Sequence, residues 1–180
     1  PPPSPMLSAL NASAAEHSGV PTATASRVLT LSPSVFARLG EPPLRALSAA
    51  FYARVFADAL DPSFRSRFSS STEKEAVDNF GDFLVARLGG DPAVYMRRRK
   101  GYRLIGRHAA FGVGRGDAGR WLVHMRAALG EVREIVEDGE VREALYDWFA
   151  HTAYYIVAGQ EFQNPSQLSG GLVIDGEKNW

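Results

Sequence analysis

The segment GRHAAFGV, residues 106–113, places His108 after an arginine in a stretch that follows neither a helical nor a strand period. The chain has four histidines and no cysteine, so metal binding would depend on imidazole or carboxylate ligands. His17 lies near the N-terminus, and we expect His124 to face solvent and His151 to be a hydrogen-bonded helix residue. His108 is therefore the strongest candidate for a metal ligand.

Two further side chains could act with this imidazole. Tyr52 and Trp121 each occur on an otherwise apolar helical stripe, and each carries an O–H or N–H group that needs a partner when buried. One interpretation is that each donates to a backbone carbonyl in the core. The other is that they line a pocket with His108, an arrangement suited to an iron porphyrin with histidine on one face and a gas on the other.

The sequence carries none of the familiar enzyme signatures, such as a P-loop, HExxH, GxSxG or CxxC motif. Basic and acidic residues number 20 each, so no overall charge would attract nucleic acid or an anionic membrane. No apolar run approaches the ~20 residues of a membrane span. We therefore predict a soluble protein of the cytoplasm, with a plastid as the alternative compartment.

Helices are the elements that must hold these residues in place. Helical spacing of apolar residues predicts one short helix and four longer ones, and no strand is expected. Their signals are SPSVFARLG with Ser32 as cap, the stripe Leu44 to Val55, a capping box of Thr72 and Glu75, a stripe from Asp117 to Val136, and a last helix ending before Gly159.

The connection from Asp91 to Arg107 shows neither period and concentrates cationic residues. A structureless connection of this length inside a domain is commonly functional, and its basic side chains could meet the propionates of a porphyrin. We expect residues 1–31 to form a flexible extension, 32–163 the folded domain and 164–180 a polar tail.

Several blocks of sequence resemble a truncated hemoglobin of group II, of the kind found in plants and green algae. They occur in the family's order and spacing: FYARV at 51–55, LGGDPAVY at 88–95, KGYRLIGRHAAF at 100–111, GRWLVHM at 119–125 and HTAYYIVAG at 151–159. The resemblance implies an all-α, two-over-two helical sandwich in which the segment before the haem-binding histidine is mostly unstructured.

By position, His108 resembles the family's proximal iron ligand, while Tyr52 and Trp121 resemble residues that stabilise the distal ligand. Phe68 is similar to the aromatic residue that wedges the haem, with Phe64 as the alternative. The other residues that the resemblance places at the cofactor, haem b, are Ala76, Phe80, Tyr95, Lys100, Arg107 and Met125.

The resemblance implies a protein that binds O2, NO or CO and releases oxygen slowly, with nitric oxide dioxygenation as the expected reaction. An unidentified reductant would be needed, and a homodimer is left open. A peroxidase-like or nitrite-reducing haem enzyme is the first alternative. The second is a helical interaction protein without a cofactor, in which Tyr52 and Trp121 are simply core residues.

Overall fold

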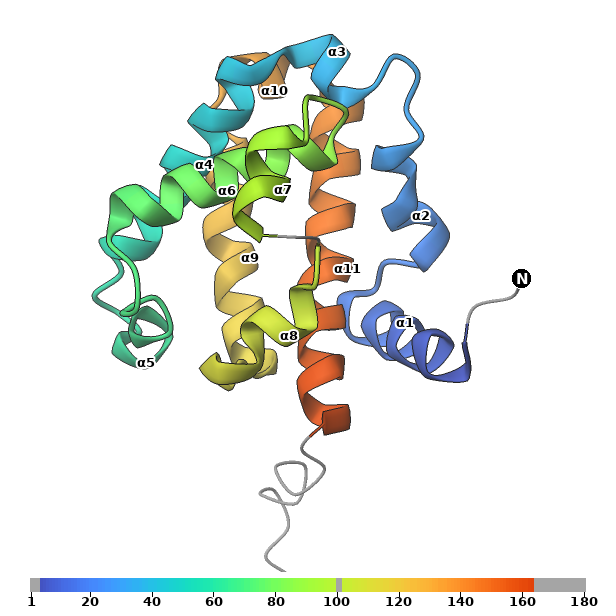
Figure 1. Ribbon diagram of the computed structural model, residues 1–180, viewed down its shortest axis with the longest axis vertical. Coiled ribbons are helices and arrows are strands. Elements are labelled where there is room, and N and C mark those ends of the chain that lie inside the picture. Colours follow the sequence, from blue (N-terminus) through green and yellow to red (C-terminus); the bar gives the residue numbers. More distant parts are fainter. Residues whose placement is uncertain (1–3, 100–101, 164–180) are drawn as a thin grey trace, which may run out of the picture.

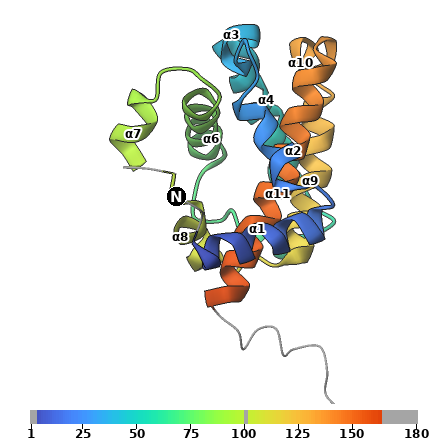
Figure 2. The same ribbon diagram turned by 90° about the vertical axis from the view of Figure 1, so that its right-hand side faces the viewer.

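Four long helices form the centre of the computed structural model, which describes residues 4–99 and 102–163. Helix α4 packs against α6 and also against α9, while α9 packs against α11. In Figures 1 and 2, α6 crosses the direction shared by α9 and α11, as expected for a two-over-two sandwich. The helices are α4 (Glu41–Phe56), α6 (Glu73–Arg87), α9 (Arg115–Leu129) and α11 (Gly139–Gln163). The described residues contain no strand, which confirms the all-α prediction.

The starts of these helices follow from local sequence. Thr72 Oγ1 accepts the Glu75 N–H, and the Glu75 carboxylate accepts the Thr72 N–H, so the predicted capping box of α6 is confirmed. The Asp117 carboxylate accepts the Gly114 N–H at 2.8 Å from within the first turn of α9. Helix α3 (Val35–Leu39) is capped by Ser34, and not by Ser32 as expected.

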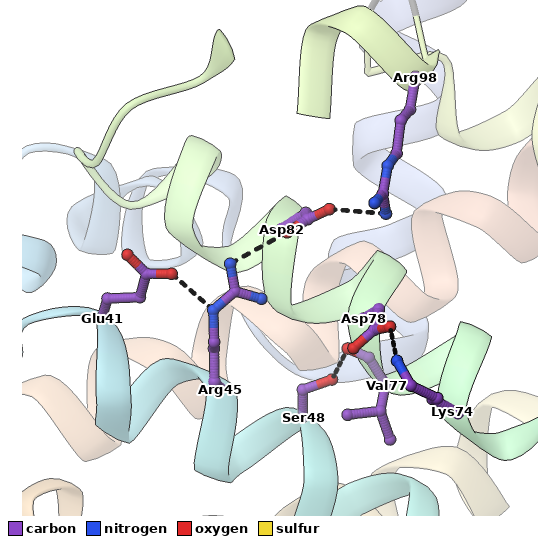
Figure 3. Close-up of polar contacts among 8 residues, drawn as sticks. All are labelled: Glu41, Arg45, Ser48, Lys74, Val77, Asp78, Asp82 and Arg98. Carbon is purple, nitrogen blue, oxygen red and sulfur yellow. Dashed lines mark hydrogen bonds and ion pairs between the residues drawn. The ribbon is translucent and has the colours of Figure 1, made fainter. Parts of the chain in front are cut away.

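Polar contacts hold α4, α6 and α7 (Ala93–Arg99) together on one side of the molecule (Figure 3). The buried Asp82 of α6 accepts from Arg45 of α4 at 3.1 Å and from Arg98 of α7 at 3.0 Å. The Ser48 hydroxyl donates to the Val77 carbonyl at 2.8 Å. A buried carboxylate needs such partners, so Asp82 fixes α7 against α6.

The N-terminal region differs from the expected flexible extension. Helix α1 (Pro5–Ser18) is capped by Ser4, whose hydroxyl accepts the Leu7 N–H. It packs along α11 together with α2 (Thr22–Ser26) and η1 (Arg27–Leu29). The ring of His151 on α11 lies 3.0 Å from the Val20 carbonyl, which confirms the expected hydrogen-bonded helix histidine. The prediction of a flexible extension failed because residues 1–31 contain few large apolar side chains that would indicate packing.

The predicted polar tail, residues 164–180, lies outside the described residues.

The connection from 91 to 107 is less irregular than its sequence indicates. It contains α7 and the start of α8 (Leu104–His108), and η2 (Ala109–Phe111) follows directly. Helices of seven and five residues are too short to show a clear apolar period. The prediction of a mostly unstructured segment is therefore wrong for α7 and α8. Lys100 lies outside the described residues.

Two expected helix boundaries were also wrong. The stripe expected to continue to Val136 is divided at Gly130 into α9 and α10 (Arg133–Glu137). The last helix continues through Gly159 to Gln163. This glycine does not end α11 but provides space for Ile105 of α8, which packs against it. Within the described part of the chain, no helix combines the length and the apolar character that crossing a membrane requires.

Candidate functional site

A cavity of about 460 Å³ lies between α4, α6, α8, α9 and α11, and we call it the central cavity. Its wall is mostly aromatic and aliphatic, with cationic side chains contributed by Arg67, Arg99 and Arg107. Most of the residues singled out from sequence line it: Tyr52, Phe64, Phe68, Ala76, Phe80, Tyr95, Arg107, His108 and Trp121. Residues up to about 100 positions apart in sequence therefore meet around one apolar space.

His108 ends helix α8 and contributes an imidazole to the cavity wall. Its Nδ1 lies 2.8 Å from the Leu104 carbonyl, one turn earlier in the helix. A carbonyl oxygen can only accept, so Nδ1 carries the proton and the Nε2 lone pair of the neutral ring is left for a metal. Burial lowers the pKa of His108, the hydrogen bond to Leu104 opposes this shift, and the positive charge of Arg107 adds to it. The neutral, ligating form is therefore favoured.

Helix α8 is held in place by α11. Ile105 packs against the backbone of Gly159, where an added Cβ atom would lie 2.6 Å from the isoleucine Cδ1. One residue further along α11, the buried Gln160 donates its side-chain N–H to the Ile105 carbonyl at 3.3 Å. Because His108 lies one turn after Ile105, these contacts set the position of the imidazole.

Tyr52 and Trp121 provide two hydrogen-bond donors at the cavity. Both pack on Phe80, whose ring centroid lies 6.0 Å from that of Tyr52 and 6.3 Å from that of Trp121. Neither donor has a hydrogen-bond partner among residues 4–99 and 102–163, so the expected alternative, donation to a core carbonyl, is not seen there. Burial raises the pKa of Tyr52 to about 12, which keeps its hydroxyl proton in place. Among the described residues, the cavity thus contains two donors without an acceptor.

Both candidate wedge residues lie in the cavity wall. Phe64 is almost fully buried, and Phe68 stacks edge-on against it at 5.2 Å and against Tyr52 at 6.0 Å. On α6, the small side chain of Ala76 lines the same space as Phe80. An alanine at this position provides no hydrogen-bond donor to the cavity.

Cationic groups lie where α7 and α8 border the cavity. The Arg107 guanidinium contacts the Tyr95 hydroxyl and donates to the Arg99 carbonyl at 3.0 Å. Its Cζ also lies 5.3 Å from the centre of the Tyr95 ring. These contacts aim Arg107 along the cavity wall, where it could neutralise an anionic edge of a ligand.

Two expectations about helix α9 are wrong. Met125 is completely buried in the core and is not among the residues that line the cavity, because its face of α9 is covered by neighbouring helices. His124 is buried and its Nε2 lies 2.7 Å from Oδ2 of Asp58, whose carboxylate Arg120 also binds at 2.7 Å. Arg120 and His124 are one helical turn apart, so they share a face of α9. This spacing is the sequence signal that could have indicated a common carboxylate partner for the two side chains.

Sequence reasoning also missed contributions from two segments. Arg67, in the loop after α5 (Pro62–Ser66), donates to the Phe111 carbonyl at 2.8 Å and so connects this loop to the residues that follow His108. From α11, Trp148 and Phe149 form an apolar wall. Both lie within the last predicted helix, and nothing in their spacing separates a cavity wall from a packed core.

The donor set indicates the type of group that the central cavity could hold. The described residues contain no cluster of three or more histidine, cysteine or carboxylate side chains able to enclose a metal ion. One imidazole in an apolar cavity therefore fits a metal whose other ligands come from a flat organic group. The residues present fit an iron porphyrin, and Arg99 and Arg107 in the cavity wall could meet its acidic groups.

Comparisons with known proteins agree with this geometry. A family model described as bacterial-like globin matches residues 34–155. The chain is 38% identical over 134 residues to two-on-two hemoglobin-3 of Arabidopsis thaliana, which covers 74% of each chain. It is also 39% identical over 158 residues to group 2 truncated hemoglobin 3-1 of Lotus japonicus, covering 88% of this chain and 90% of that protein.

Proposed function

The chain belongs to the bacterial-like (truncated) globin family, and we propose that it binds haem b through His108 and holds oxygen for reaction with nitric oxide. Family membership implies a haem cofactor and the binding of small gases in general. The residue assignments and the reaction are our proposal. The observation that carries it is the 2.8 Å contact between His108 Nδ1 and the Leu104 carbonyl, inside an apolar cavity.

When bound, haem supplies an iron atom that accepts an imidazole nitrogen on one face and a diatomic gas on the other. The protein orients the imidazole, because the Leu104 carbonyl fixes both its tautomer and its ring angle. The aromatic side chains Phe68, Phe80 and Phe149 line the cavity and would limit the access of water to a bound haem. An apolar lining of this kind would slow loss of the cofactor and oxidation of the iron.

The Tyr52 hydroxyl and the Trp121 N–H govern how tightly a polar gas is held. The Tyr52 hydroxyl and the Trp121 N–H could each donate a hydrogen bond to a gas that carries partial negative charge, and such bonds would be partly charge-assisted. Each such bond contributes about 1.5 to 3 kcal/mol. Slow release of oxygen follows, which suits chemistry on the gas better than transport.

Nitric oxide dioxygenation is the reaction proposed for this site. Nitric oxide, oxygen and one electron combine to give nitrate, so each turnover needs one electron from a reductant. A peroxidase-like or nitrite-reducing activity is the alternative, and it would use the same His108 and cavity.

The test uses the haem-loaded protein, with its ferrous carbon monoxide spectrum recorded first. Consumption of NO in the presence of oxygen should yield nitrate in equal amount, at a rate well above that of free haem. Turnover with peroxide or nitrite, without nitrate formation from NO, would instead favour the alternative. A chain that takes up no haem when haem is added would contradict both proposed activities.

A further inference from the structure

The region around α7 and α8 carries a concentrated positive charge in a chain with no net charge. Between Asp91 and Asp117 there is no acidic residue, while arginines occur at 97, 98, 99, 103, 107 and 115. Such local charge creates a field that the rest of the surface does not share. We use the name cationic mouth for three exposed arginines of this region, Arg97, Arg99 and Arg103, together with the exposed Arg87 at the end of α6.

Ion pairs inside the protein do not account for the cationic mouth. The neighbouring Arg98 pairs with Asp82 at 3.0 Å, so the charge of Arg98 has a structural role within the fold (Figure 3). Arg97 and Arg103 are exposed, and neither forms an ion pair with any carboxylate in the described ranges 4–99 and 102–163. Their charges are therefore available to a partner.

Aromatic contacts connect the cationic mouth to the central cavity. The half-buried Tyr102 stacks on Tyr95 with ring centroids 5.2 Å apart, and Tyr95 lines the cavity. The guanidinium of Arg87 lies 5.1 Å from the centre of the Tyr102 ring, on the side of the cationic mouth. A group bound at this surface would therefore lie a few packed side chains from the cofactor.

We propose that the cationic mouth is the docking surface for an acidic electron-transfer protein, one that carries a flavin or an iron–sulfur centre. The inference rests on the proposed function, because nitrate formation consumes one electron per turnover. The donor centre loses one electron, and ferric iron in the cavity gains it and becomes ferrous. Charge complementarity selects an acidic partner and accelerates the encounter.

A different partner, an anionic membrane surface, would be attracted by the same arginines. The electron donor is favoured because Arg99 lines the cavity and Arg87 lies over the ring of Tyr102, which stacks on the cavity residue Tyr95. A membrane-binding surface would require no connection to the cavity. The experiment below separates the two partners.

The test compares two double variants of the full chain after haem loading. Arg97→Glu with Arg103→Glu reverses charge at the cationic mouth, at positions that do not line the cavity. Arg133→Glu with Arg142→Glu makes the same change in net charge around α10, which Figure 2 shows on the other side of the molecule from α7. The probe is an acidic flavodoxin reduced to its hydroquinone, and a small uncharged photoreductant serves as the control donor.

We expect the Arg97/Arg103 variant to be reduced by flavodoxin about tenfold more slowly than wild type at low ionic strength. The difference should shrink as salt is added. Reduction by the uncharged donor and the carbon monoxide spectrum should not change. Calorimetry should show weaker flavodoxin binding by this variant, whereas the Arg133/Arg142 variant should behave as wild type.

Equal reduction rates for both variants and wild type would overturn the proposal. So would binding of wild type to phosphatidylserine vesicles, lost in the Arg97/Arg103 variant, without any binding of flavodoxin. If the chain takes up no haem, the proposed function fails at the initial spectrum. The calorimetric comparison then still decides whether an acidic protein docks at this surface.

Discussion

Ile105 packs so closely on Gly159 that a Cβ atom at the glycine would lie 2.6 Å from the isoleucine Cδ1. This contact joins helix α11 to the short helix that ends at His108. We expect Gly159→Ala to displace α8 and to accelerate haem loss about tenfold, because overpacking of this kind costs about 1 to 3 kcal/mol. Transfer of haem to an acceptor protein measures the rate.

The matched control is Gly116→Ala, a helical glycine with nothing within 4 Å of an added Cβ. It should leave haem loss unchanged and should raise stability slightly, since alanine is the better helix former. Equal rates of haem loss in both variants would show that the Ile105 contact does not position His108.

Trp121→Phe and Tyr52→Phe each remove one donor and retain the aromatic ring. We expect oxygen release to accelerate about tenfold to a hundredfold in each variant, because a charge-assisted hydrogen bond contributes about 1.5 to 3 kcal/mol. Carbon monoxide accepts hydrogen bonds poorly, so its release should change much less. Stopped-flow kinetics for the two gases provide the comparison, and unchanged oxygen release would reject the role of that donor.

Asp58 predicts a specific dependence of stability on pH. The Arg120 guanidinium holds the pKa of the Asp58 carboxyl well below its ordinary value of 3.8, and His124 adds to this shift. Its contribution to stability is therefore fully present above about pH 4 and is lost as the pH falls toward the folded-state pKa. Asp58→Asn should lower the melting temperature at neutral pH, and the difference from wild type should shrink in acid.

Glu137→Gln is the control for this effect, since Glu137 pairs with Arg133 on the exposed surface of α10. Exposed pairs of this kind contribute little, so its melting temperature should follow that of wild type at each pH. A difference between wild type and Asp58→Asn that stays constant into strong acid would contradict the assignment.

Arg67→Leu should loosen the connection between the loop after α5 and the residues that follow His108. The variant cannot donate to the Phe111 carbonyl, which Arg67 reaches at 2.8 Å. We expect faster haem loss with unchanged oxygen release from the molecules that retain haem, because Tyr52 and Trp121 are untouched. Slower or unchanged haem loss would show that Arg67 does not help to close the cavity.

The sequence predicted those parts of the fold that have a repeated local signal. Helix α6 combines a capping box with a long apolar stripe, and it forms as expected. Helix α8 has five residues, fewer than two turns, so its helical state depends on contacts with Gly159 and Gln160. Helix α1 is held by α11, and no local pattern indicates a contact between segments more than 100 positions apart.

The candidate site shows the same division. Tyr52 and Trp121 could be selected because their polar groups interrupt apolar stripes, and His108 could be selected by elimination among the four histidines. All three line the cavity. Met125 and His124 were misplaced because a stripe shows which residues share a helix face but not which partner covers that face. Asp58 lies more than 60 positions from His124, so only the folded chain brings them together.

Reconstitution with haem of wild type and of His108→Gly tests the central claim most directly. Wild type should bind one haem per chain, and its ferrous form should show an iron–histidine stretching band in the resonance Raman spectrum. The variant should bind haem weakly and lose this band, and added imidazole should restore both. If His108→Gly binds haem as tightly as wild type and keeps the band without imidazole, His108 is not the ligand.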